Sequence, residues 1–126
     1  MGCALTEAWV SPIPKTRPAP PSHDLGKPAA VYTYKDRNGD PSYAVYRWDT
    51  GGGDKQFRPL TLWRTADGKP VWRWNYPPAP MPLWGLDVLT ANPDAVAFVV
   101  EGEKTAMAAQ ALFPDLAVVT SGSSSR

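Results

Sequence analysis

The apolar and polar positions of the chain follow two different patterns, and the change lies near residue 77. Before it, short aromatic and β-branched runs alternate with turn sequences; the runs are 31–34, 43–48, 56–64 and 71–76. The turn at 36–41 contains Asn-Gly, which readily adopts the positive φ angles of a tight hairpin, and Ala-Asp-Gly-Lys at 66–69 joins the last two runs. The pattern predicts two antiparallel hairpins, with Pro59 and Pro70 at strand edges or ends.

The second pattern begins with an apolar run at 95–100, which ends abruptly at Glu101 and Gly102. An alanine-rich segment at 103–112 follows, and 116–120 is a further short apolar run. A near-continuously apolar strand is typical of a buried parallel strand, and its parallel partner needs a helical crossover. We therefore predict a β-α-β unit and the α+β class, with an antiparallel β-rich region followed by this α/β unit.

Prolines interrupt the remaining segments. Residues 1–30 carry six of the fifteen prolines, which predicts a loose, disordered and partly polyproline tail with a solvent-exposed His23. A second proline cluster opens a connector at 77–94, in which 83–89 is expected to form a short turn or helix. The predicted organisation is a tail at 1–30, a β region at 31–76, the connector, and an α/β unit at 95–126.

Charge and composition narrow the function classes. The formal charge of the 126 residues is +1, but 31–76 holds eight bases against five acids, and 77–126 holds five acids against two bases. This asymmetry suits a protein that grips polyanions in one place and metal in another, although ordinary surface charge accounts for it equally well. One cysteine and one histidine exclude a disulfide framework and a Cys/His zinc site. No run approaches the roughly 20 apolar residues of a membrane span, so we expect no membrane partner and a cytoplasmic location.

Glu101 carries the most informative chemistry, because it lies where the predicted strand gives way to the helix. Ligands of open α/β sheets bind at the carboxyl ends of the strands, and the positive end of a helix dipole favours an ionised carboxylate there. Such a carboxylate suits a hard divalent cation. Capping of the helix accounts for the same spacing.

The sequence Val-Val-Glu-Gly-Glu-Lys-Thr-Ala at 99–106 resembles the first motif of toprim domains. Toprim is the metal-dependent fold of bacterial-type DNA primases, topoisomerases and some nucleases, and the Glu-Gly-Glu-Lys form is most similar to primase-like proteins of phages, plasmids and mobile elements. Segments 32–40, 45–48 and 55–58 are similar to the basic β region that precedes the toprim in these proteins, and 82–89 to their connector.

The resemblance implies that Glu101 is the catalytic acid and a ligand of Mg²⁺ or Mn²⁺ in the full-length protein, beside two aspartates of a later strand. Those aspartates do not occur before Arg126, so we expect an N-terminal fragment of a longer protein. The implied function of the parent is metal-dependent nucleotidyl transfer that makes RNA primers from nucleoside triphosphates on single-stranded DNA, with a replicative helicase as a further partner. The fragment alone is expected to be inactive, because one carboxylate cannot hold a pair of divalent cations.

The remaining predicted site residues bind phosphate. Arg47, Lys55 and Arg58 match the basic region and would contact template or nucleotide phosphates. Lys104, one helical turn beyond Glu101, reaches a phosphate or is a solvated helix lysine. The backbone amides of Gly102, Ser121 and Gly122 are further candidates to cradle phosphate. For Ser121 and Gly122, a flexible end accounts for the sequence equally well. The interleaved aromatic residues stack single-stranded bases or form a core; they are Trp48, Phe57, Trp63, Trp72 and Trp74.

Two alternative functions stay open. Thr105 and Met107 stand where family members often carry an aspartate, which favours a catalytically dead module that binds single-stranded nucleic acid. A toprim nuclease or topoisomerase relative is the other alternative, and the basic β region argues against it.

Overall fold

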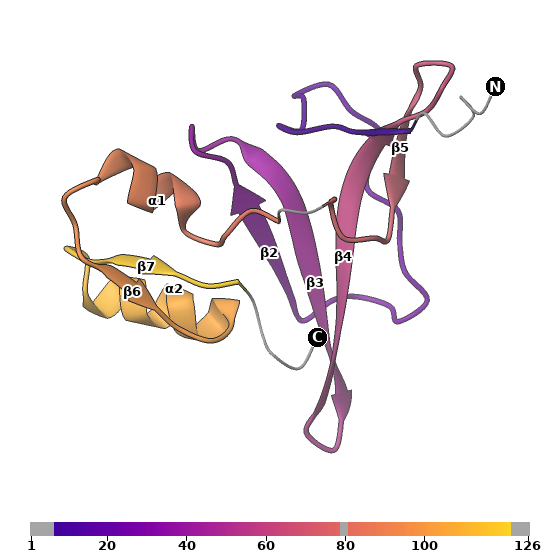
Figure 1. The fold of residues 1–126 in the computed structure, drawn as a ribbon. Helices are drawn as coiled ribbons and strands as arrows, with labels where there is room; N and C mark the ends of the chain where they lie inside the picture. Colours follow the sequence, from indigo (N-terminus) through magenta and orange to yellow (C-terminus); the bar gives the residue numbers. More distant parts are fainter. Residues whose placement is uncertain (1–6, 79–80, 122–126) are drawn as a thin grey trace.

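A twisted antiparallel sheet forms the larger part of the molecule in the computed structural model, which describes residues 7–78 and 81–121 (Figure 1). Its main strands are β2 (Ala30–Lys35), β3 (Pro41–Gly51), β4 (Asp54–Arg64) and β5 (Pro70–Arg73). The predicted antiparallel pairs, β2 with β3 and β4 with β5, are both confirmed. The loop expected at 50–54 is tighter than predicted, because β3 and β4 continue as one long hairpin as far as Gly51 and Asp54.

The two faces of this sheet have different neighbours. Alternate residues of a strand point to opposite faces. Tyr34, Tyr43 and Val45 form a buried cluster on one face, against which Trp84 of the connector packs. The opposite face carries Trp48, which contacts the N-terminal segment.

The N-terminal segment differs from the loose tail predicted for it. The strand β1 (Ala8–Trp9) pairs with β4, and the segment that follows lies across the sheet. The indole Nε1 of Trp48 donates a hydrogen bond to the carbonyl of Gly26 at 2.9 Å, and that of Trp72 donates to the carbonyl of Pro18 at 2.9 Å. Prolines prevent a regular strand here, but the main-chain carbonyls of the segment remain acceptors, and a packed indole N–H needs such a partner.

His23 is likewise not solvated as predicted. Its ring is half-buried, with its centroid 4.9 Å from the ring centroid of Trp48 and 4.9 Å from that of Trp74. The sheet therefore uses the N-terminal segment as a cover for its second face.

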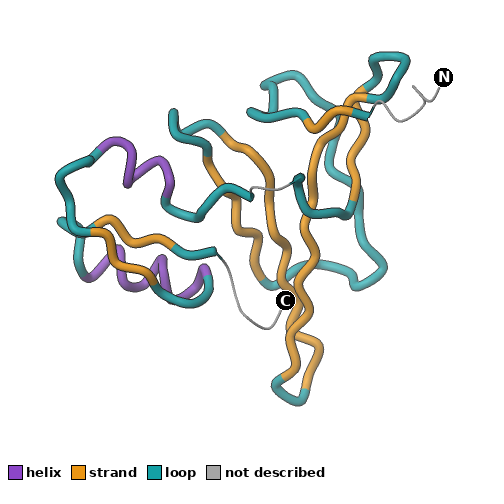
Figure 2. Tube along the Cα trace, viewed as in Figure 1, coloured by secondary structure: helices purple, strands orange, loops and turns teal. Residues whose placement is uncertain are grey.

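The C-terminal unit lies on the β2 side of the sheet and contains both helices (Figures 1 and 2). Its elements are α1 (Leu86–Ala91), β6 (Ala97–Val99), α2 (Glu103–Leu112) and β7 (Ala117–Val119). Since β6 and β7 pair in parallel through the α2 crossover, the predicted β-α-β unit is confirmed, and the fold is mixed α+β.

The two strands of this unit are not equally buried, although both are apolar in sequence. The residues of β7 are at most 4% exposed, whereas Val99 of β6 is 74% exposed and Phe98 is 45% exposed. The reason lies in the strand neighbours. β7 has β6 on one side, and Thr120 directly after β7 forms a bridge to Trp84 on the other, while β6 pairs only with β7 among the described residues. The expectation of a buried strand is therefore wrong for β6.

Candidate functional site

A polar cavity of about 190 Å³ lies where the sheet meets the start of α2. It gathers most of the predicted site residues from segments that are far apart in the sequence. The strands supply Arg47 and Lys55, and the loop and first turn of α2 supply Glu101, Gly102 and Lys104. The other lining residues are Tyr32, Phe57, Glu103 and Thr105. We refer to this cavity as the phosphate pocket, after the phosphate contacts that the sequence predicts for Arg47, Lys55 and Lys104.

The strand register explains which bases reach the phosphate pocket. Arg47 of β3 lies opposite Phe57 of β4, and Asp49 lies opposite Lys55, so these residues share one face of the sheet. Arg58 was predicted to act with Arg47 and Lys55, but it follows Phe57 directly and lies on the other face, where its guanidinium donates to the Phe57 carbonyl at 2.8 Å. Arg58 therefore does not belong to the pocket.

Arg47 is held rigidly at the wall of the phosphate pocket. Its side chain is 12% exposed, and its Nε donates to the Asp49 carboxylate at 2.9 Å. Hydrogen bonds to the Tyr32 hydroxyl and, next, to Asp49 raise the pKa of the guanidinium above its ordinary value. Arg47 is thus a fixed, permanently charged group with further N–H donors in its fork.

The loop between β6 and α2 has a shape that only glycine adopts readily. Gly102 has φ 85° and ψ 149°, a region essentially closed to other residues. Its N–H donates to the Thr120 hydroxyl at 3.1 Å, which ties the loop to the end of β7. This bond uses the amide that was predicted to cradle phosphate, so the role proposed for Gly102 is not supported. Ser121 is exposed at the end of β7, and Gly122 lies outside the described residues.

The second carboxylate of the motif has a role that was not predicted. Glu103 is 1% exposed and accepts a hydrogen bond of 2.7 Å from the hydroxyl of Tyr34, which is itself fully buried. This bond joins the first turn of α2 to β2. Alternation in 31–34 places Tyr32 and Tyr34 on one face and was the available signal, but no sequence pattern paired that face with Glu103. Glu101, in contrast, is exposed beside the phosphate pocket.

The phosphate pocket is suited to anions rather than to cations held by protein ligands alone. Three cationic side chains line it against two carboxylates, and one of these, Glu103, accepts the Tyr34 hydrogen bond. Among the described residues there is no group of three His, Cys, Asp or Glu side chains placed to hold a metal ion. The donor set of residues 7–78 and 81–121 therefore does not fit a divalent cation pair.

No protein-family model, curated protein or solved structure matches this chain. The toprim resemblance thus stays a prediction that rests on the motif and on its position between β6 and α2. Neither helix of the described chain has the length and apolar character needed to cross a bilayer.

Proposed function

We propose that the chain binds the phosphates of nucleoside triphosphates and of single-stranded DNA, as part of a toprim primase-like replication protein. The observation that carries the proposal is the phosphate pocket, in which Arg47, Lys55 and Lys104 lie beside Glu101 at the carboxyl end of β6. Arginine forks and lysine ammonium groups are the side chains that proteins use for phosphate oxygens.

Each base has a distinct part in this proposal. Arg47, fixed by Tyr32 and Asp49, orients one phosphate through its planar fork. Lys55 and Lys104 are exposed and approach from opposite sides, one from the sheet and one from α2. They add charge that does not depend on the sequence of the strand.

Primer synthesis by metal-dependent nucleotidyl transfer is the reaction we propose for the parent protein. Mg²⁺ or Mn²⁺ would supply charge stabilisation there. Since the described residues do not fit a metal pair, we assign this chain the binding and orientation of phosphates and derive no catalytic step from it.

The phosphate pocket is tested by the salt dependence of binding to a fluorescent oligothymidylate. The logarithm of the affinity for single strands falls with the logarithm of salt concentration in proportion to the number of phosphates contacted, with a slope of about −0.7 per contact. K55A and K104A should each weaken binding at low salt and make this slope shallower by about 0.7.

The matched control is K69A, which removes an exposed lysine in the turn between β4 and β5. Unchanged affinity and slope in the K55A/K104A double variant would refute the proposal. A loss in K69A equal to that in K55A would show that binding follows total charge rather than this pocket.

A catalytically dead binding module is the second function we consider. It is favoured by the engagement of Glu103 with Tyr34 and by the absence of a three-ligand metal group among the described residues. Template-dependent synthesis assays with Mg²⁺ or Mn²⁺ separate the two. Product that the wild-type parent protein makes and its E101Q variant does not supports the enzyme, and strand binding by the wild-type parent protein without any product supports the module.

A further inference from the structure

The phosphate pocket continues as a groove along α2. A cavity of about 350 Å³ shares Tyr32, Arg47 and Lys104 with it. A larger cavity of about 380 Å³ shares Met107 with that second cavity. Lys104, Met107 and Ala111 follow one face of α2 over two turns, a rise of about 10 Å. The groove thus links the phosphate pocket to an elongated space suited to one nucleotide.

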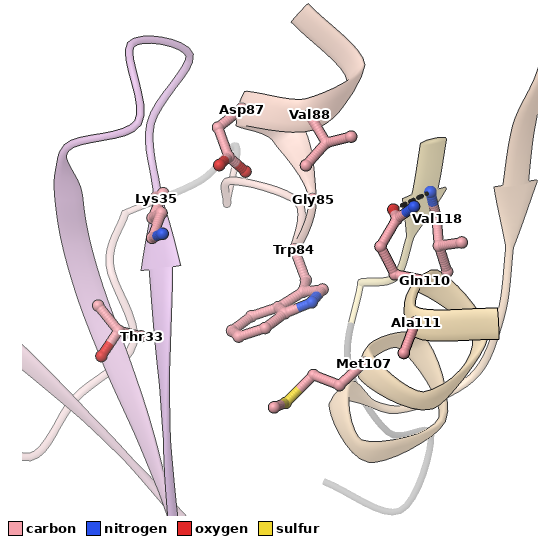
Figure 3. A pocket seen from close by; sticks show the side chains of 10 residues that line it. All are labelled: Thr33, Lys35, Trp84, Gly85, Asp87, Val88, Met107, Gln110, Ala111 and Val118. Carbon is pink, nitrogen blue, oxygen red and sulfur yellow. Dashed lines mark hydrogen bonds between the residues drawn. The ribbon is translucent and has the colours of Figure 1, made fainter. Parts of the chain in front are cut away.

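The far cavity has a different character, and Figure 3 shows its lining. The indole of Trp84 projects into the space between β2 and α2, with Met107, Val88 and Ala111 around it. Such a slot suits a flat aromatic group. We call this cavity the base pocket.

The polar groups that could recognise a ligand here are few. The Gln110 amide is occupied, because its Nε2 donates to the carbonyl of Leu116 at 2.7 Å and its Oε1 accepts from the Val118 N–H at 3.0 Å. Lys35 and Asp87 are the charged lining residues, from β2 and the first turn of α1. Within the described chain, no ion pair or side-chain hydrogen bond involves either of them, so an ammonium donor and a carboxylate acceptor face the same slot.

We propose that the base pocket binds guanine, as the base of a nucleoside triphosphate whose phosphates occupy the phosphate pocket. This inference rests on the proposed function. Guanine presents O6 and N7 as acceptors for Lys35. Its adjacent N1–H and N2–H₂ groups donate to the two oxygens of Asp87.

The other bases lack this pairing. Adenine and cytosine each offer an exocyclic amine, but a ring-nitrogen lone pair lies beside it and would face the carboxylate of Asp87. Uracil has one N–H between two carbonyls. Only guanine therefore gives a carboxylate two adjacent donors while offering acceptors to a lysine.

Isothermal titration calorimetry of the 126-residue chain with GTP, ATP, CTP and UTP tests the proposal. GTP should bind at least about tenfold tighter than the others, as expected for one good bidentate contact. D87N should lose this preference and gain binding of xanthosine triphosphate, because an asparagine amide can donate to the carbonyl that replaces the guanine amine. K35A should weaken GTP binding through the loss of the O6 and N7 donor.

The matched control is D94N, which makes the same change of charge at an exposed acid after α1 and should keep the GTP preference. Inorganic tripolyphosphate is the probe for the phosphate pocket alone. If the four nucleotides bind equally and tripolyphosphate displaces them, the base pocket is refuted and the phosphate pocket stands. If neither tripolyphosphate nor any nucleotide binds, both the base pocket and the proposed function are refuted. A GTP preference that D87N leaves unchanged also overturns the proposal.

Discussion

Replacing Tyr34 with phenylalanine removes one hydroxyl group from the centre of the molecule. That hydroxyl donates the 2.7 Å hydrogen bond to Glu103, and the two residues are 0% and 1% exposed. The phenylalanine ring keeps the stacking on Tyr43, at a centroid distance of 4.6 Å, and the edge contact with Trp84 at 5.2 Å. Y34F therefore isolates the polar contact between the sheet and α2.

The expected loss follows from the chemistry of that contact. Removing one partner of a buried hydrogen bond costs about 1–3 kcal/mol, and no cavity forms because the ring stays. We expect the free energy of unfolding of Y34F to fall by about that amount. For a chain of this size, about 4 °C per kcal/mol gives a midpoint lowered by about 4–12 °C.

Urea unfolding followed by tryptophan fluorescence measures this loss, and Y76F, at an exposed tyrosine, is the matched control. E103Q completes a double-mutant cycle, in which Y34F and E103Q should be coupled by at least about 0.5 kcal/mol. Strictly additive losses, or a loss in Y34F no larger than that in Y76F, would contradict the assignment of this bond.

Two further predictions concern stability. In G85A the new Cβ would overlap the backbone carbonyl of Val118, and φ is 87° there, so we expect a loss of at least about 2 kcal/mol by thermal unfolding. G68A, with φ 84° but open space around it, should lose less, and equal losses would contradict the overlap. Burial raises the pKa of Tyr46, so its contribution to stability is complete below the ordinary tyrosine value of about 10 and is lost as pH rises through the higher native value. Urea midpoints between pH 9 and 11 should fall less steeply in Y46F, and identical slopes would refute the effect.

The hairpins and the β-α-β unit were predictable because local chemistry determines them. Asn38-Gly39 sets the turn between β2 and β3, and the apolar run before Glu101 followed by an alanine-rich segment sets the order of β6 and α2. The meeting of Arg47 and Lys55 with Glu101 was not predicted. The strand register explains why the two bases share one face of the sheet, but no sequence pattern placed that face against the start of α2.

Other features depend on contacts that no local pattern contains. The cover formed by the N-terminal segment rests on main-chain carbonyls, which every sequence has, so its prolines indicated only that it forms no regular element. The burial of Glu103 depends on Tyr34, 69 positions earlier. The exclusion of Arg58 from the phosphate pocket, in contrast, could have been predicted from the sequence. Side chains alternate along a strand, so Arg58 lies on the opposite face from its neighbour Phe57.

The hydrogen bonds of Trp48 and Trp72 to the N-terminal segment also bear on how freely that segment can evolve. Both indoles bond to carbonyls, those of Gly26 and Pro18, and not to side chains. A substitution between these positions leaves the acceptors in place as long as the path of the chain is kept. The segment can thus drift in sequence while its cover of the sheet persists, and the two tryptophans are the constrained partners of the contact.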